Sequence, residues 1–388
     1  MVDFTFIDLF AGIGGFHQAM IQLGGECVFA SEIDKYAIET YKKNYGIEPK
    51  KDICEIEAKD IPKHDVLCAG FPCQAFSIAG HCKGFDDETR GTLFFEIERI
   101  LNYHHPKYII LENVRNLVSH DKGRTWQTIK SHLHQSGYRL TEEPLIVSPH
   151  HFGIPQLRER VIILGIYDPN NVTKPLNINL GTLKSKDDNS IYTILDDNVD
   201  TKYNISDEEK KVLTMWDEFY QGIDLDVIGF PIWFEWFKKE PSENMSKWKK
   251  RVIERNNELY RRNKDFIDSW AQKYNNLENC TAIQKKFEWQ AGNRINSVWD
   301  GLIQFRQSGV RVKAPNCFPT LVAIVQTSII GKYKRRLTVR EAARLQSFPE
   351  DFVLNDNDQQ AYKQLGNAVN VEVIKKCAKK MFDLELVK

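Results

Sequence analysis

The chain has 388 residues, of which 42% are hydrophobic, and its 53 basic side chains are matched by 53 acidic ones. This length and apolar content suffice for a folded core and predict two domains. A formal net charge of zero excludes a uniformly basic nucleic-acid-binding protein, so any surface that binds nucleic acid has to be local.

The eight cysteines form neither a Cys-x-x-Cys pair nor a Cys/His zinc spacing. The first residues lack the charged segment of a signal peptide, and no apolar run reaches the roughly 18 residues that span a bilayer. We therefore expect a cytoplasmic protein with reduced thiols, no metal site and no membrane contact.

Residues 1–167 alternate between short apolar strands and helices with helical apolar spacing. Strands are expected at 4–10, 27–31, 65–68, 108–111 and 160–166, and helices at 16–23, about 93–101 and about 126–133. This order predicts the α/β class with a doubly wound, largely parallel sheet.

The pattern breaks near Pro169, and residues 203–300 hold seven of the eight tryptophans without any strand–helix rhythm. We expect a second, smaller, inserted module there. Within it, residues 238–264 contain ten Lys or Arg and four Glu, and one helical face is predicted to carry an apolar stripe, namely Trp248, Val252, Leu259 and Phe266. Such a helix is either a solvated face over a core stripe or a surface that contacts phosphates.

After this module, Thr338 and Glu341 have the spacing of a capping box, which predicts a helix that ends before Pro349. The segment 364–370 then precedes a final helix, expected at about 371–382.

The first segment with chemical character is the glycine-rich turn 8–16 after the first strand. Glycines let the backbone approach a bound nucleoside closely, and the following helix presents free N–H groups. Glu32 ends the second strand, 20 residues beyond Gly12, where a carboxylate can bind two ribose hydroxyls; Asp52 could accept from an adenine amino group. The set predicts an adenosine-containing ligand, although NAD enzymes share this turn and some such turns only serve packing.

Three further segments lie next to predicted strands. Cys73, in 69–77, follows the strand 65–68; a buried structural thiol is the alternative, which suits Cys68 better. Glu112 follows the strand 108–111, where a helix cap or a surface ion pair is the alternative role. Arg158 and Arg160 share one face if the chain there is extended. Ligands bind at the carboxyl edge of such sheets, so we expect these side chains to meet there.

With these motifs in place, the chain resembles the cytosine-C5 DNA methyltransferase family of the bacterial restriction–modification type. The resemblance covers about 1–167 and 333–388, through the segments 6–16, 70–77, 112–114, 156–160, 335–349 and 364–369 in the family's order. It implies a Rossmann-like methyltransferase domain formed by 1–178 and 360–388, a target-recognition domain at 179–333 and a connecting segment at 334–359.

The resemblance also implies the reaction. Cys73 attacks C6 of a cytosine flipped out of double-stranded DNA, Glu112 bonds N3 and the amino group, and Arg160 polarises O2 with Arg158 behind it. The loop 76–91, with Gly80, Gly84 and Gly91 as hinges, closes over the base. S-adenosylmethionine donates the methyl group and leaves as S-adenosylhomocysteine. The residues implied to bind it are Phe10, Ala11, Gly12, Ile13, Gly15, Glu32, Ile33, Asp52, Ile53, Pro72, Leu93, Asn367 and Ala368.

As partners we expect double-stranded DNA and a restriction endonuclease of the same system, with the enzyme itself a monomer associated with the nucleoid through DNA. The nearest alternative is a tRNA cytosine methyltransferase with the same chemistry. A NAD-dependent oxidoreductase would leave the Cys73 and Arg158–Arg160 segments unexplained, and the intact Cys73 and Glu112 argue against an inactive DNA-binding relative.

Overall fold

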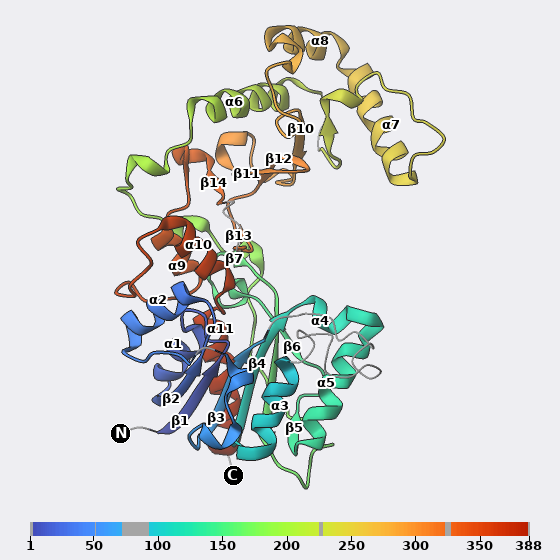
Figure 1. Ribbon diagram of the computed structural model, residues 1–388. Coiled ribbons are helices and arrows are strands. Elements are labelled where there is room, and N and C mark those ends of the chain that lie inside the picture. The colour runs from blue at the N-terminus through green and yellow to red at the C-terminus, as the bar shows by residue number, and fades with distance from the viewer. Residues whose placement is uncertain (1–2, 51, 72–92, 225–227, 323–326, 387–388) are drawn as a thin grey trace. The chain divides into compact units, whose positions relative to one another are not determined.

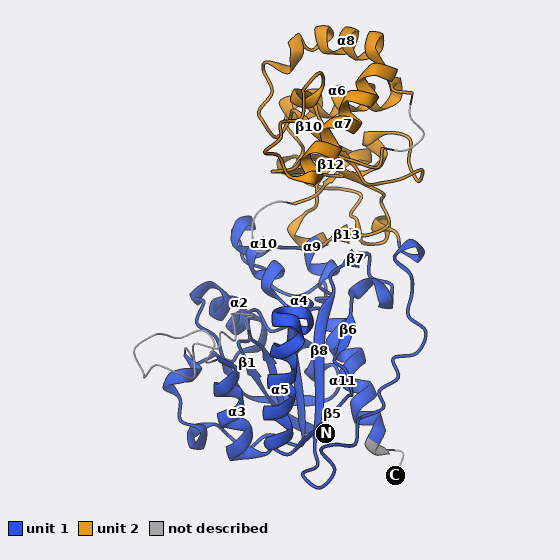
Figure 2. Ribbon diagram, turned by 90° about the vertical axis from the view of Figure 1, so that its right-hand side faces the viewer, with its two compact units in different colours: residues 1–189, 320–325, 342–388 blue, residues 190–319, 326–341 orange. Residues whose placement is uncertain are grey.

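The computed structural model describes residues 3–50, 52–71, 93–224, 228–322 and 327–386 (Figure 1). The chain forms two compact units, shown in blue and orange in Figure 2. Unit 1 consists of residues 1–189, 320–325 and 342–388, and unit 2 of residues 190–319 and 326–341. Unit 1 is therefore discontinuous in sequence. The division falls at 189 and at 341, so the expected connecting segment 334–359 is shared between the two units.

Unit 1 alternates strands and helices in its first half and ends in helices. Its strands and helices are β1 Phe4–Leu9, α1 Gly15–Ile21, β2 Gly25–Ser31, α2 Lys35–Tyr45, β3 Val66–Gly70, α3 Leu93–His104, β4 Tyr108–Val114, α4 Asn116–Ser119, α5 Arg124–Gln135, β5 Tyr138–Leu140, β6 Leu145–Val147, β7 Gln156–Leu157, β8 Arg160–Tyr167, α10 Asp358–Asn367 and α11 Val371–Leu386. Helix α9, Val339–Leu345, contains the second unit boundary. The predicted elements are confirmed, with ends that differ by a few residues.

The sheet of unit 1 has the strand order β2-β1-β3-β4-β8-β5, and β6 also pairs with β8. Strands β1 to β4 are parallel, whereas β8 runs antiparallel to β4, β5 and β6. The sheet is thus parallel only in its first four strands. Parallel neighbours need a crossover connection, usually an α-helix, whereas the segment 148–159 between β6 and β8 contains only a 3-10 helix, Pro149–Phe152, and the short strand β7.

The two faces of this sheet are covered by different helices. Ile7 and Leu9 of β1 belong to the same hydrophobic cluster as buried side chains of α3 and α5. Phe6 points to the other face, since side chains alternate along a strand, and its ring contacts His17 of α1. On that face Phe4 also meets Phe382 of α11. The carboxyl ends of the parallel strands are left for a ligand.

Unit 2 combines a second sheet with three helices. Its elements are α6 Asp207–Gly222, β9 Ile232–Trp233, α7 Lys247–Arg262, α8 Lys264–Lys273, β10 Lys286–Trp289, β11 Leu302–Arg306, β12 Gly309–Lys313, β13 Phe318–Pro319, β14 Ile329–Ile330 and β15 Arg335–Arg336. Six strands pair in the order β15-β14-β11-β12-β10-β9. Trp216 of α6 stacks on Phe287 of β10 with ring centroids 4.9 Å apart, and Trp270 of α8 joins the same core. Trp216, Trp270 and Trp289 thus lie in a core that is separate from that of unit 1.

The expected basic helix is α7, but its apolar stripe is shorter than predicted. Val252 and Leu259 are buried, whereas Trp248 is 54% exposed. Phe266 belongs to α8, because the helix ends at Asn263, whose backbone (φ −119°, ψ 26°) leaves the helical region. Trp248 lies only two residues after the capping residue Ser246, in the first turn of the helix, which extends beyond the core.

The predicted capping box is confirmed. The Glu341 backbone N–H donates to the Thr338 hydroxyl (3.1 Å), and the Thr338 N–H donates to the Glu341 carboxylate (2.8 Å). Glu341 is also the buried partner of Arg335 at 2.7 Å. The Glu341 carboxylate thus caps the start of α9 and also neutralises the buried Arg335.

Six of the eight cysteines lie in the described ranges, where none of them is joined to another in a disulfide. Among the helices described for this chain, none combines the length and the apolar character needed to cross a membrane.

Candidate active site

Unit 1 contains a cavity of about 810 Å³ at the carboxyl ends of β1 to β4. This volume accommodates a ligand the size of a nucleoside with a side chain. The described residues that line it are Phe10, Gly12, Ile13, Ser31, Glu32, Ile33, Asp34, Ala37, Asp52, Ile53, Cys54, Gly70, Phe71, Leu93, Glu112, Asn113, Val114, Arg158, Arg160, Lys363, Gln364, Gly366 and Asn367. Both ends of the chain therefore contribute to one cavity.

Twelve of the seventeen predicted site residues line this cavity: Phe10, Gly12, Ile13, Glu32, Ile33, Asp52, Ile53, Leu93, Glu112, Arg158, Arg160 and Asn367. Cys73 and Pro72, and with them the loop 76–91 and its three glycines, lie outside the described residues. The other three, Ala11, Gly15 and Ala368, are buried beside the cavity and do not line it.

These three residues act through packing or backbone. Ala11 packs with Ala30 and Tyr41 beneath the turn. A Cβ atom on Gly15 would come within 2.7 Å of Val369, so glycine allows the turn and the C-terminal segment to approach closely. The Ala368 carbonyl accepts hydrogen bonds from the side chains of Arg158 (2.9 Å) and Gln346 (3.2 Å). None of the three lines the cavity, and their part in binding the methyl donor stays a prediction.

The turn after β1 and the end of β2 are joined by the Glu32 carboxylate. Its Oε2 accepts from the Gly12 N–H at 2.7 Å, and its Oε1 accepts from the N–H groups of Ile33 and Asp34, each at 2.8 Å. A carboxylate offers about four acceptor positions. Three are used, so the carboxylate is held in place and keeps an acceptor for a ligand hydroxyl.

Near Glu32, the cavity is also lined by an apolar side chain, Ile33, and by a second carboxylate, Asp52. Ile33 is 74% exposed at the cavity, which is unusual for an isoleucine and leaves its face available to a planar ring. Asp52 caps a short 3-10 helix, with Oδ1 accepting from the Cys54 N–H at 2.9 Å. The Asp52 carboxylate also interacts with the Cys54 thiol, and it keeps acceptor positions for an amino group. Carboxylates for hydroxyl and amino groups beside apolar faces fit an adenosine.

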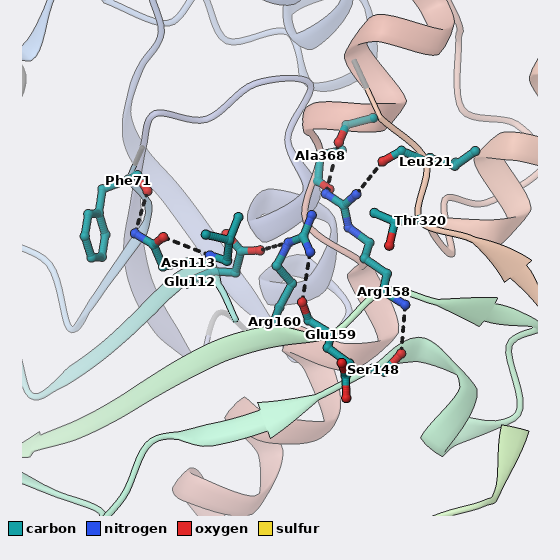
Figure 3. Close-up of polar contacts among 12 residues, drawn as sticks. Phe71, Glu112, Asn113, Ser148, Arg158, Glu159, Arg160, Thr320, Leu321 and Ala368 are labelled. Atoms are coloured by element: carbon teal, nitrogen blue, oxygen red, sulfur yellow. Dashed lines mark hydrogen bonds and ion pairs between the residues drawn. The ribbon is translucent and has the colours of Figure 1, made fainter. Parts of the chain in front are cut away.

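Farther along the same edge, Glu112 and Arg160 form an ion pair, with Arg160 Nε 3.0 Å from Glu112 Oε1 (Figure 3). Burial raises the pKa of Glu112, and the positive charges of Arg160 and Arg158 offset only part of that effect. Glu112 belongs to β4, which continues to Val114, and it pairs in register with Gly70 at the end of β3. The chain that leads to Cys73 thus starts beside this carboxyl group.

Asn113 holds the backbone of that exit segment. Its Nδ2 donates to the carbonyl of Phe71 at 2.9 Å, and its Oδ1 accepts from the Val114 N–H at 2.8 Å (Figure 3). Asn113 is 1% exposed, so these bonds are shielded from water. Phe71 is the last described residue before the segment of Pro72 and Cys73.

Arg158 faces backbone oxygens, not a carboxylate. Its guanidinium donates to the carbonyls of Leu321 (2.9 Å), Gly366 (3.0 Å) and Ala368 (2.9 Å), and the side chain is almost fully buried (Figure 3). Burial lowers the pKa of Arg158 to about 9, with repulsion from Arg160 adding to the effect, so the group stays charged at neutral pH. Both arginines line the cavity as predicted, but Arg158 ties three chain segments together.

The cavity also contains a contact that sequence reasoning missed. Lys363 of α10 donates to Asp34 at 3.0 Å, and the neighbouring Gln364 donates to the carbonyl of Tyr36 at 2.9 Å. Asp34 could have been found as the capping residue of α2, since Asp is favoured there. Lys363 gives no local signal, because its partner lies 329 positions away in sequence. In the described ranges, no group of three or more His, Cys, Asp or Glu side chains is placed to hold a metal ion.

Comparison with known proteins gives a consistent result. A family model described as C-5 cytosine-specific DNA methylase matches residues 4–383. The type II methyltransferase M1.ScrFI of Lactococcus lactis subsp. cremoris is 37% identical over 386 residues, covering 98% of this chain and 78% of the relative. M.BanI of Aneurinibacillus aneurinilyticus, also a type II methyltransferase, is 38% identical over 421 residues, covering 97% and 95%.

Solved structures share the fold at lower identity. The Dnmt2 methyltransferase of S. pombe superposes with a TM-score of 0.53 at 19% identity, covering 98% of this chain and 99% of the other. The methyltransferase EhMeth of Entamoeba histolytica gives a TM-score of 0.57 at 20% identity, covering 98% of both chains. These similarities concern the fold alone.

Proposed function

The chain belongs to the C-5 cytosine-specific DNA methylase family and is a DNA cytosine-5 methyltransferase, and we propose that it forms a covalent bond through Cys73 to a cytosine flipped out of duplex DNA. The observation that carries this proposal is the single cavity that joins an adenosine-shaped half, around Glu32 and Asp52, to the Glu112–Arg160 pair. A methyl donor and a base held at these two halves would meet at the end of β3.

The donor is proposed to be S-adenosylmethionine, held by Glu32 at the ribose, by Asp52 and Ile53 at the adenine, and by Phe10, Ile13 and Leu93 along its apolar parts. Asn367 faces the same cavity from the C-terminal segment. Pro72, outside the described residues, is carried over from the family. When bound, this group supplies an electrophilic methyl on a sulfonium, and no metal is needed for that transfer.

In the proposed reaction, the Cys73 thiolate adds to C6 of cytosine, which makes C5 nucleophilic. Glu112, whose pKa burial raises, holds a proton at N3 and accepts from the amino group, so negative charge does not build up in the ring. Arg160 bonds O2 with its remaining N–H groups. After methyl transfer to C5, the C5 proton leaves, the Sγ–C6 bond breaks, and 5-methylcytosine is released with S-adenosylhomocysteine as the second product.

Unit 2 is proposed to be the target-recognition domain. A cytosine inside a duplex is inaccessible to Cys73, so the base has to be flipped out, which costs a few kcal/mol of stacking and pairing. We further propose that the methylation protects DNA from a restriction endonuclease of the same specificity. The tRNA alternative is not favoured, because the matching family is described as a DNA methylase and the curated relatives named above are type II methyltransferases.

Labelled S-adenosylmethionine, offered with duplex DNA or with tRNA, tests the substrate. We expect label in duplex DNA only; label only in tRNA would contradict the DNA proposal. Cys73→Ser should reduce transfer to background and leave DNA affinity largely intact, because serine keeps the size of the side chain but is a poor nucleophile. Unchanged turnover of this variant would contradict the role of Cys73.

A second experiment addresses the covalent step itself. A duplex that carries 5-fluorocytosine at the target cannot lose a proton from C5, so the adduct should persist and survive denaturing electrophoresis. Bisulfite sequencing of DNA from cells that express the enzyme identifies the target beforehand. Cys73→Ser serves as the control that should form no adduct.

A further inference from the structure

Helix α7 concentrates positive charge in a chain whose formal net charge is zero. Its 16 residues include seven Lys or Arg and two Glu. One side of the helix is buried, through Val252, Ile253, Asn256, Leu259 and Tyr260. The basic side chains occupy the rest of its surface, so the charge faces solvent and is not spread around a buried helix.

These charges are not neutralised by the helix itself. Lys247, Arg251 and Arg261 are exposed and Lys250 is half-buried, and among the described residues none of the four forms an ion pair. Glu254 and Glu258 also form none, although each is three or four residues from a basic side chain, the spacing at which helix ion pairs form. A helix kept in solution by its own charges typically has such pairs, so a merely solvated face is disfavoured.

An aromatic side chain lies among these charges. Trp248 is 54% exposed and stands between Lys247 and Lys249 in the first turn. Large aromatic side chains are usually mostly buried, and an exposed one beside cations is typical of surfaces that contact nucleic acid, where the ring packs on sugars or bases.

The spacing of the cations matches a polyanion. Lys250 and Arg251 follow Lys247 by three and four residues and share its face, and Arg261 lies about three turns beyond Lys250 on the same side. At 1.5 Å per residue the row is about 20 Å long. One strand of a duplex presents a phosphate about every 3.4 Å along its axis, so such a row spans several phosphates.

We propose that this α7 basic face (Lys247, Trp248, Lys250, Arg251 and Arg261) binds the phosphate backbone of duplex DNA without reading its sequence. The inference rests on the proposed function only in taking DNA as the partner. Phosphate contacts supply affinity and salt dependence, whereas base contacts elsewhere determine sequence choice. The α7 basic face therefore holds the enzyme on DNA of any sequence.

The test uses the full chain with four substitutions that remove the charge and leave a polar side chain: Lys247→Gln, Lys250→Gln, Arg251→Gln and Arg261→Gln. Its affinity for a duplex of random sequence is measured between 50 and 300 mM salt. Each lost phosphate contact lowers the slope of log K against log salt by about 1, so we expect a slope smaller by about 3–4. Turnover at saturating DNA and low salt should stay near that of the wild type.

A matched control carries Lys43→Gln, Lys59→Gln, Lys379→Gln and Lys380→Gln, four exposed lysines of unit 1 without an ion pair among the described residues. It changes the net charge by the same amount and should keep the wild-type slope. Equal slopes for the two variants would overturn the proposal, because net charge alone would then explain the binding. Circular dichroism and tryptophan emission check that both variants fold.

Two further measurements distinguish this inference from membrane binding and from failure of the proposed function. Sedimentation with phosphatidylglycerol vesicles tests an anionic membrane as the partner; if the α7 variant loses vesicle binding and keeps its DNA slope, the inference is wrong. Absence of methyl transfer to DNA by the wild type would contradict the proposed function. The salt slopes would still decide whether α7 binds DNA.

Discussion

At the scale of single residues, the proposed reaction depends on the protonation of Glu112. Its side chain is only 12% exposed, and burial disfavours its charged form more than the two nearby arginines favour it. Arg158 and Arg160, two positions apart, divide their work: Arg160 faces this carboxyl group, and Arg158 faces three carbonyl oxygens. Arg160 thus interacts with the carboxyl group of the site, whereas Arg158 holds chain segments together.

A pH-dependent stability follows for Glu112→Gln. Because the folded-state pKa of Glu112 lies above its unfolded value, its stabilising contribution is full below the unfolded pKa and is lost as the pH rises through the folded pKa. Glutamine never ionises. Urea unfolding of both proteins between pH 4 and pH 8 should therefore show the variant gaining stability relative to the wild type as the pH rises.

The same variant should be less active at every pH, since an amide cannot exchange a proton with N3. A stability difference that stays constant across this pH range would contradict the raised pKa of Glu112. The two measurements are independent, because the unfolding experiment needs neither DNA nor the methyl donor.

The sequence predicts residues of the site well where chemistry is local. Glu32 and Glu112 could be placed because each ends or nearly ends an apolar strand, and strand ends meet at one edge. Lys363 could not, because its role comes from a partner across the fold. Arg158 was predicted to lie at the site, but its carbonyl partners depend on how the segments of 321 and 366–368 fold, which the motif does not encode.

At the scale of elements, the turn between β1 and α1 determines the shape of the donor half of the cavity. Gly14 has φ +88°, and a methyl group there would overlap the ring of Tyr45, whose hydroxyl donates to the Gly14 carbonyl at 3.0 Å. Gly46, at the end of α2, also has a positive φ of +70° but has open space around it. A side chain at either glycine would strain the backbone, but only at Gly14 would it also collide with a neighbouring residue.

Gly14→Ala and Gly46→Ala should therefore differ. For Gly46→Ala we expect a loss of about 1–2 kcal/mol from the left-handed backbone alone. For Gly14→Ala we expect about 1–3 kcal/mol more, because the methyl group has no room beside Tyr45. Calorimetric titration with S-adenosylhomocysteine should show weaker binding for Gly14→Ala only. Equal losses of stability and affinity in both variants would contradict the crowding at Gly14.

Elements were predicted where apolar periodicity and helix caps agree, as in the capping box of Thr338 and Glu341. The direction of a strand could not be predicted from its residues. The sequence of β8 is that of any apolar strand in a parallel sheet, and only its pairing with β4 shows that it is antiparallel. The break at Asn263 was missed because residues on both sides keep a helical pattern, while the asparagine side chain accepts a bond from the Asp224 N–H.

At the scale of the whole molecule, the two units have separate hydrophobic cores and differ strongly in their number of tryptophans. Unit 2 holds seven of the eight tryptophans, and Trp126 is the one in unit 1. Only unit 1 contributes residues to the described cavity. The discontinuity of unit 1 was expected from the match of Asn367 to the donor site, whereas the boundary at 341 was not, since it falls inside α9.

Ligand binding should therefore stabilise one unit selectively. S-adenosylhomocysteine at about 100 times its dissociation constant adds about 2.7 kcal/mol, which raises the melting temperature of a unit of this size by about 5–10 °C. We expect this shift in the unfolding transition of unit 1. Circular dichroism detects that transition, whereas tryptophan emission, which comes mainly from unit 2, detects it only weakly. A matching shift in the tryptophan transition would show that the two units unfold together.

The contribution of residues 363–367 to the cavity has a consequence for the order of events during synthesis. Strand β4 leaves the ribosome about 10–50 s before these residues do, at the usual rate of about 5–20 residues per second. Only in about the last 2–9 s of that interval has residue 319 emerged, so that the first segment of unit 2 is present while the donor half of the cavity still lacks Lys363 and Asn367. A nascent chain therefore cannot complete this cavity, and cannot carry out the proposed methyl transfer, before residues 363–367 have been made.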